Sequence, residues 1–173
     1  MGGGSSDAFA LLGLTPRFDI DADTLEKAFF ERSKELHVDK FAHLPASERV
    51  VALSKSRAIN DAYQLLKKPA SRAEYLMARE GIVIGDNERI DPALVMDLLE
   101  EREALSEARV AGKLDVVENM QAAMKARRKA AFEQIKTLFG APVIGWAEIK
   151  QQLILLRYVE RYLEECDSAL DEV

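Results

Sequence analysis

Residues 23–69 read DTLEKAFFERSKELHVDKFAHLPASERVVALSKSRAINDAYQLLKKP, and this stretch decides the fold. It opens with Asp23-Thr24-Leu25-Glu26, which is typical of a capping box at the start of a helix. Apolar residues then recur at helical spacing on one face, so the pattern predicts an amphipathic helix that ends near His37. The apolar positions of that face are Leu25, Phe29 and Leu36.

A second amphipathic helix follows after a short connection. Its predicted span is residues 46–66, with an apolar stripe that includes Ile59 and Leu66. Pro69 ends it, because proline cannot continue the backbone hydrogen-bond ladder. Residues 37–45 between the two helices are predicted to be a loop, so the stretch as a whole predicts a helical hairpin.

Helical periodicity continues on both sides of the hairpin, without strand-like alternation of convincing length. With its flanking short helices, the hairpin is predicted to form a domain over residues 7–81. Gly85-Asp86-Asn87 indicates a linker over residues 82–90. Short turns between three further helices predict an antiparallel three-helix bundle over residues 91–173. The predicted helices span residues 92–110, 114–139 and 146–169. The fold class is therefore all-α, and residues 1–6 are predicted to be a flexible lead.

Composition argues against several functions. The formal net charge of −6 disfavours nucleic-acid binding, because phosphate contacts require a positive surface. No apolar run approaches the ~20 residues that span a bilayer, and no signal peptide is visible, so we expect a cytoplasmic protein without a membrane partner. Cys166 is the single cysteine, and His37 and His43 lack further ligands at metal spacing, so neither a metal nor a cofactor is expected. The basic run at residues 127–129 is interpreted as a solvated helix face.

His37 and Asp39 lie two residues apart in the predicted loop, and three interpretations of them compete. A hydrolytic dyad would need a nucleophile and an anion-binding glycine loop, and neither is nearby. A polar turn would be unremarkable. A recognition tip would present an imidazole and a carboxylate to a cationic groove on a partner protein. The two residues by themselves do not decide between the last two interpretations.

The order of motifs along the chain resembles a J domain, and the HscB branch of J-domain proteins in particular. The resemblance covers nearly the whole chain after residue 7, and motifs in this order and spacing are highly specific. The motifs are Phe9-x-Leu11-Leu12-Gly13-Leu14, His37-x-Asp39-Lys40-Phe41, Ala58-Ile59-Asn60-x-Ala62-Tyr63, Arg72-Ala73-Glu74-Tyr75-Leu76 and Met96-x-x-Leu99-Glu100-x-Arg102-Glu103.

The resemblance implies a co-chaperone with no catalytic activity of its own. Its J domain would stimulate the ATPase of a seventy-kilodalton heat-shock chaperone of the HscA or DnaK type. The implied chaperone contacts are His37, Val38, Asp39 and Lys40, assisted by the basic residues Lys27, Arg32 and Lys34 of the preceding helix. Glutamates are interleaved with those three basic residues, so an ordinary solvated face is an equally good interpretation of them.

Val38 departs from the family pattern, which has proline at this position. Proline locks its own φ and restricts the residue before it, whereas valine favours extended backbone and leaves an additional amide. We expect the loop to sample more states and the stimulation of the ATPase to be weakened or lost. The alternative function is a J-like adaptor that binds a scaffold protein without activating a chaperone.

A second candidate site lies on the predicted helix 92–110, where an apolar patch runs into a row of carboxylates on one stripe. From the pattern alone, a core edge beside a solvated acidic face is the better interpretation. The resemblance implies instead that this helix, with help from the last one, holds an iron–sulfur scaffold protein of the IscU type. The implied scaffold contacts are Val95, Met96, Leu99, Glu100, Glu103, Glu107 and Tyr158.

Overall fold

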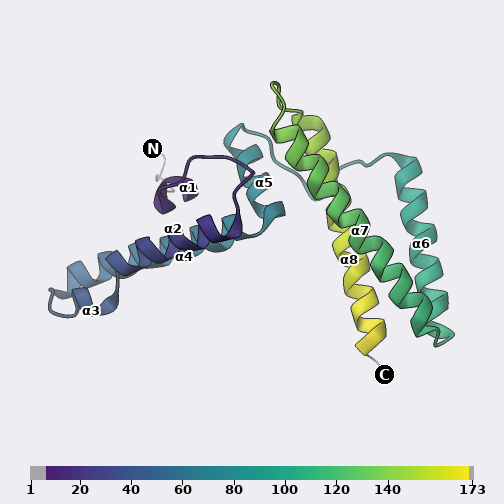
Figure 1. Cartoon of the computed structure of the whole chain (residues 1–173), viewed down its shortest axis with the longest axis horizontal. Coiled ribbons are helices and arrows are strands. Elements are labelled where there is room, and N and C mark those ends of the chain that lie inside the picture. Colours follow the sequence, from purple (N-terminus) through teal and green to yellow (C-terminus); the bar gives the residue numbers. More distant parts are fainter. Residues whose placement is uncertain (1–6, 172–173) are drawn as a thin grey trace. The chain divides into compact units, whose positions relative to one another are not determined.

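The computed structural model describes residues 7–171, and all of the secondary structure in that range is helical (Figure 1). The predicted all-α fold class is therefore confirmed. The chain divides into two compact units, Met1–Gly81 and Ile82–Val173. Residues 1–6, predicted to be a flexible lead, lie outside the described residues. No helix within residues 7–171 is long and apolar enough to cross a membrane.

The N-terminal unit is built around a helical hairpin. Its long arms are α2 (Ala22–Glu35) and α4 (Ala46–Lys67), and a single helical turn, α3 (Val38–Phe41), lies at its tip (Figure 1). Two short helices, α1 (Ala8–Leu12) and α5 (Pro69–Arg79), pack against α4. The hairpin thus carries α3 between two arms that also pack against each other.

Aromatic and aliphatic side chains hold the two arms together. The Phe29 ring of α2 stacks on the Tyr63 ring of α4, with 4.4 Å between the ring centroids. Leu25, Ile59 and Leu66 are buried, as their spacing predicts. Full burial of one such aliphatic side chain contributes roughly 1.5–3 kcal/mol. This packing holds α2 against α4, the helix on which α3 packs.

The predicted N-cap of α2 is wrong by two residues. Asp21, not Asp23, caps the helix: its carboxylate accepts hydrogen bonds from the Thr24 amide at 2.8 Å and from the Thr24 hydroxyl at 2.6 Å. These hydrogen bonds lower the pKa of the Asp21 carboxyl. Asp23 instead occupies the first turn, where its negative charge is favourable at the positive end of the helix dipole.

The predicted loop over residues 37–45 is also only partly correct, because α3 forms within it. Val38 begins that helical turn, so the expectation of extended backbone at Val38 is wrong. The Lys40 amide donates to the His37 carbonyl at 2.9 Å and closes the turn. Since α3 packs against α4, tertiary contacts override the local preference of a β-branched residue.

A buried arginine joins α5 to the end of α4. Arg72 is 7% exposed, and its Nη1 donates to the Leu66 carbonyl at 2.9 Å. Leu66 lies in the last turn of α4, where carbonyl oxygens lack partners inside the helix. The guanidinium carbon also lies 5.2 Å from the centroid of the Phe18 ring. Burial lowers the pKa of the Arg72 guanidinium, and the charge of Asp19 acts in the opposite direction.

Replacing Arg72 with alanine is expected to destabilise the N-terminal unit by about 2 kcal/mol, because a hydrogen bond from a charged donor contributes about 1.5–3 kcal/mol. In a unit of this size, that loss lowers the midpoint of thermal unfolding by roughly 10 °C. Circular dichroism during heating measures the shift. Arg57→Ala is the matched control, since Arg57 is exposed on α4. Equal midpoints for the two variants would contradict this role of Arg72.

The C-terminal unit is a bundle of α6 (Pro92–Val110), α7 (Leu114–Phe139) and α8 (Trp146–Asp171) (Figure 1). The bounds of α6 and α7 agree with the prediction, and α8 extends two residues beyond it. Two cross-helix pairs show that α7 and α8 are antiparallel, since Gln121 contacts Asp167 and Arg128 contacts Glu160.

The core of the bundle lies mainly between α7 and α8. α6 contributes the narrow buried stripe Leu98, Leu105 and Ala108. Cys166, the single cysteine, is fully buried in this core. Burial raises the pKa of its thiol to about 11, so the thiol is protonated at neutral pH. The side of α6 that faces away from its buried stripe remains open to solvent.

Ion pairs connect the three helices of the bundle. Arg127 of α7 lies 3.2 Å from the Glu101 carboxylate of α6, and Arg128 lies 3.4 Å from the Glu160 carboxylate of α8. The two arginine side chains remain 28% and 39% exposed, so they lie at the surface, as the interpretation of a solvated face expects, and they also form ion pairs with the neighbouring helices. Consecutive helical positions point about 100° apart, so α7 directs them to different neighbours.

The segment predicted to be a linker, residues 82–90, groups with the C-terminal unit. The Glu88 carboxylate lies 2.8 Å from Lys150 Nζ and accepts a hydrogen bond from the Gly85 amide at 3.0 Å. Arg157 donates to the Gly85 carbonyl at 3.3 Å. Lys150 and Arg157 both belong to α8, so this part of the segment is attached to the bundle.

Candidate functional site

The hairpin tip, defined as residues 37–40, presents His37 and Asp39 to solvent. Their side chains are 65% and 89% exposed, and 3.3 Å separates His37 Nδ1 from the Asp39 carboxylate. The Asp39 amide donates to the same nitrogen at 3.4 Å, so His37 caps α3. An imidazole and a carboxylate thus lie side by side on an exposed turn. Such a pair lacks the water-excluding enclosure of an acid–base site and suits contact with a partner protein.

The other two tip residues are exposed as well. Val38 is 66% exposed at the first position of α3, and Lys40 is exposed in the last turn of the same helix. All four predicted tip residues therefore lie together on the surface. Among residues 7–171, no group of three histidine, cysteine, aspartate or glutamate side chains is placed to hold a metal ion.

The three basic residues predicted on α2 do not share one face. Lys27 and Lys34 are seven residues apart on its exposed side, whereas Arg32 lies about 140° around the helix axis from Lys27. Arg32 leans toward α1, since a Cβ atom added at Gly13 would lie 2.7 Å from its Nη2. It also lies 3.5 Å from the Glu35 carboxylate. The helix therefore groups the two lysines and separates Arg32 from them.

The α6 face, defined as Met96, Leu99, Glu100, Glu103 and Glu107, points away from the buried stripe of its helix. Met96 and Leu99 are 57% and 53% exposed, so neither is a core-edge residue. All three glutamates are exposed, and no ion pair among residues 7–171 involves them. The structure therefore brings an apolar patch and unpaired carboxylates together on one side of α6.

Val95 and Tyr158 flank the α6 face. Arg102 of α6 pairs with Glu165 of α8, and its Nε donates to that carboxylate at 3.1 Å. Val95 precedes Arg102 by seven residues, and Tyr158 precedes Glu165 by seven residues. Because α6 and α8 run in the same direction, this spacing places Val95 and Tyr158 at one level on adjoining sides of the two helices. Val95 is half-buried and Tyr158 is 40% exposed.

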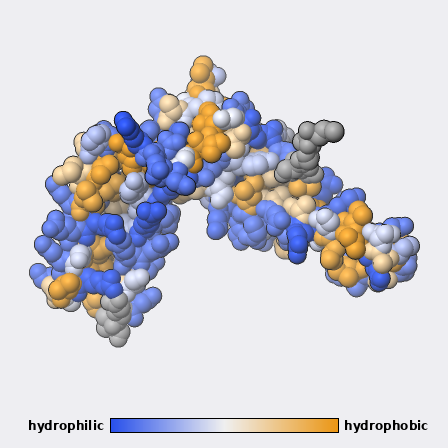
Figure 2. Space-filling view, turned by 180° about the vertical axis from the view of Figure 1, so that it is seen from behind, coloured by the Kyte–Doolittle hydropathy of each residue, from blue (hydrophilic) through white to orange (hydrophobic). Residues whose placement is uncertain are grey.

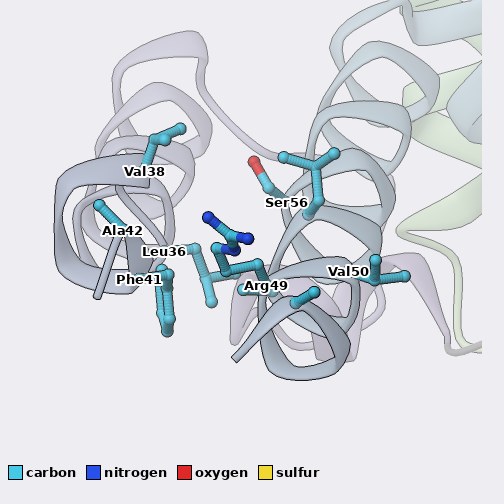
Figure 3. A pocket seen from close by; sticks show the side chains of 10 residues that line it. Leu36, Val38, Phe41, Ala42, Arg49, Val50 and Ser56 are labelled. Carbon is cyan, nitrogen blue, oxygen red and sulfur yellow. The ribbon is translucent and has the colours of Figure 1, made fainter. Parts of the chain in front are cut away.

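Sequence reasoning missed an apolar surface beside the tip. Val50 and Leu53 of α4 are 68% and 65% exposed, and with Val38 they line a groove between α3 and α4 (Figure 3). In the chain Val50 and Leu53 lie on either side of Ala52, and neither belongs to the buried stripe of α4, which is Ala52, Ile59, Ala62 and Leu66. The sequence of α4 contains more apolar residues than its buried stripe requires, and this excess was the signal that could have revealed the surface.

The comparisons with known proteins agree with this architecture. The family described as HSCB C-terminal oligomerisation domain matches residues 90–167. The chain is 31% identical to a co-chaperone protein HscB homolog of Ralstonia nicotianae, over 99% of this chain and 100% of that protein. It is 34% identical to an HscB homolog of Neisseria meningitidis, over 95% of this chain and 99% of that protein.

A solved structure shows the same likeness in three dimensions. The chaperone HscB from Vibrio cholerae superposes with a TM-score of 0.82 and 28% sequence identity, over 96% of this chain and 99% of the other. Both units of the chain thus match one relative along its whole length. Sequence and structure together lead to one conclusion: this chain belongs to the HscB family of co-chaperones.

Proposed function

We propose that the protein is a J-type co-chaperone of iron–sulfur cluster assembly. In this proposal residues 7–81 form the J domain that engages a seventy-kilodalton heat-shock chaperone of the HscA or DnaK type. Residues 91–173 bind an iron–sulfur scaffold protein of the IscU type, and residues 82–90 join the two domains. The protein has no catalytic activity of its own and increases the rate of ATP hydrolysis by the chaperone.

One observation carries the proposal. In a chain of the HscB family, His37 and Asp39 occupy an exposed turn where neither serves the core of its own unit. Exposed ionisable residues that contribute nothing to the core favour a function in recognition. Binding one partner with each domain raises the effective concentration of scaffold and chaperone for each other, so cluster release can be coupled to ATP hydrolysis.

The test is a single-turnover ATPase assay of the chaperone with the full chain, with and without a scaffold protein. We expect the chain alone to accelerate hydrolysis, and the scaffold to increase that acceleration further. A chaperone rate that the chain leaves unchanged, both alone and with the scaffold, would overturn the proposal.

Val38 bears on how strong the stimulation is. It occupies the first position of a helical turn, where proline is favoured because that amide has no partner inside the helix. His37 before it has φ −62° and ψ 137°, an extended conformation that a following proline permits. The backbone is thus already compatible with proline, and the difference between the two residues lies in the freedom of the unbound tip.

Val38→Pro is expected to lower the half-saturating concentration in the ATPase assay about two- to fivefold, because a compatible proline removes roughly 0.4–1 kcal/mol of chain entropy. Val38→Ala is the control, since it removes the branched side chain without constraining φ. Full and equal stimulation by the parent and Val38→Pro would refute the idea that Val38 weakens activation.

A second function, a scaffold-binding adaptor that no longer activates a chaperone, is favoured by the valine in place of the proline that the family has. It predicts that a pull-down recovers the scaffold while the chaperone rate stays unchanged. It also predicts that Val38→Pro restores stimulation. Stimulation by the parent chain would exclude this alternative.

A further inference from the structure

The hairpin tip continues into an apolar groove between α3 and α4 (Figure 3). The tip groove, as we call it, has a volume of about 390 Å³, within the range of pockets that bind small ligands. Its walls are apolar except for Arg49 and Ser56. The large apolar residues that line it are Leu36, Val38, Phe41, Val50 and Leu53.

The apolar walls of the groove are exposed to an unusual degree. Val38, Val50 and Leu53 are each about two-thirds exposed, at 66%, 68% and 65%. Figure 2 shows hydrophobic residues gathered at the end of the hairpin that carries α3. Contiguous apolar surface of this kind marks sites of interaction, because leaving it in water is unfavourable. The packing of the hairpin does not explain this exposed apolar surface, because neither Val50 nor Leu53 belongs to the buried stripe of α4.

Arg49 supplies a charge inside this apolar surface. Figure 3 shows its guanidinium extending into the space between α3 and α4, toward the side of the groove where Ser56 lies. No ion pair among residues 7–171 involves Arg49. A guanidinium pairs with a carboxylate through two parallel hydrogen bonds, and apolar surroundings strengthen that pairing. The groove therefore fits an apolar segment that carries one acidic group.

The groove and the tip share a residue. Val38 lies between His37 and Asp39 in the chain and also lines the groove. A protein that contacts both the imidazole and the carboxylate of the tip therefore reaches the rim of the groove. This continuity favours one occupant of the groove, namely a segment of the partner protein that contacts the tip.

We propose that the tip groove binds an apolar, carboxylate-bearing segment of the heat-shock chaperone that contacts His37 and Asp39. This inference rests on the proposed function and extends it, because it gives the chaperone a second contact on the same end of the hairpin. The groove supplies apolar burial and one ion pair, and the tip supplies the polar contacts.

The test titrates full-length variants into the chaperone ATPase assay. Val50→Ser combined with Leu53→Ser is expected to raise the half-saturating concentration about tenfold, because each change removes apolar surface that the bound segment would bury. Maximal stimulation is retained, since His37 and Asp39 are intact. Val83→Ser combined with Val143→Ser is the matched control, because those valines are 71% and 83% exposed in the other unit. Circular dichroism verifies that both doubles fold.

The charge of Arg49 is tested separately. Arg49→Glu is expected to raise the half-saturating concentration about tenfold, and Arg49→Lys about threefold or less, because lysine keeps the charge without the paired hydrogen bonds. Equal half-saturating concentrations for Arg49→Glu and the parent would overturn the inference that the bound segment carries an acidic group.

The assay distinguishes a failure of this inference from a failure of the proposed function. If the parent stimulates the chaperone and the Val50/Leu53 double variant does so with the same half-saturating concentration, the groove is not a chaperone contact. If the parent neither binds nor stimulates the chaperone, the proposed function fails as well. Light scattering compares the oligomeric states of the parent and the double variant. A dimeric parent and a monomeric double variant would assign the groove to a second copy of the chain and overturn the inference.

Discussion

Asp39→Asn is expected to raise the half-saturating concentration for chaperone ATPase stimulation about 30-fold or more, because losing one partner of a desolvated charge pair costs roughly 2–5 kcal/mol. In the concentration range where the parent saturates, the variant then gives almost no stimulation. The Asp39 side chain is 89% exposed, and its carboxylate contacts only His37 among residues 7–171. Asparagine keeps the shape of the side chain and removes its charge.

The fold should survive this change, which separates recognition from stability. The amide that closes the α3 turn belongs to Lys40, so the turn does not depend on the Asp39 carboxylate. We expect the thermal midpoint of Asp39→Asn to stay within about 1–2 °C of the parent, as for other exposed positions. Asp86→Asn, at an exposed position of the other unit, is the charge-matched control and should stimulate like the parent. Full stimulation by Asp39→Asn would remove the tip from the proposed interface.

Glu100→Lys combined with Glu103→Lys is expected to weaken binding of the iron–sulfur scaffold protein about 100-fold, because placing like charges opposite each other costs several kcal/mol. Both side chains are exposed beside Met96 and Leu99. The pairs that join α6 to its neighbours use Glu101 and Arg102 instead, so reversing Glu100 and Glu103 leaves those contacts intact. Isothermal titration calorimetry measures the affinity directly.

The matched control moves the same charge change to another helix. Glu118→Lys combined with Glu133→Lys alters the net charge equally, at exposed positions of α7. We expect this double variant to bind the scaffold within about threefold of the parent, because both positions lie on α7, outside the α6 face. Affinity that is unchanged by the α6 reversals, or lowered equally by both doubles, would count against the α6 face as a specific site. The J domain should stimulate the chaperone normally in either variant.

The positions of the long helices could be predicted because each depends on signals that are local in the chain. The bounds of α6 and α7 follow from Pro92 in the first turn, from the turn at Gly112 and from apolar spacing between them. Gly112 has φ +65°, a conformation that glycine adopts without steric cost. The core stripe of the hairpin was predicted for the same reason, since a period of 3.6 residues specifies a face once the helix exists.

The predictions from sequence are wrong where two local conformations or two capping residues are about equally favourable. Asp21 and Asp23 are both aspartates before the same helix, and only the path of the preceding chain brings the Asp21 carboxylate to the Thr24 amide. Val38 favours extended backbone on its own, and packing of α3 against α4 makes it helical. The ion pairs of Arg127 and Arg128 could not be predicted from the sequence either, because α6 and α8 supply the carboxylates.

The candidate binding surfaces were also only partly predictable from the sequence. The stripe of Met96, Leu99 and the glutamates was visible in the sequence, but whether its apolar end faced the core or solvent was not. That choice depends on which side of α6 meets α7 and α8, and Leu98, Leu105 and Ala108 occupy that side. The tip groove was not predicted, because Val50 and Leu53 differ from core residues only in what lies opposite them.

The amino-acid sequence by itself determined that the chain is helical, where its long helices lie and which motifs it shares with HscB proteins, since these depend on neighbours within a few positions. Only the tertiary structure decided that His37 and Asp39 are exposed on a helical turn, that the α6 glutamates are unpaired, and that an open groove with Arg49 adjoins the tip. Exposure and pairing depend on residues far away in the chain, and those contacts form only when the helices pack.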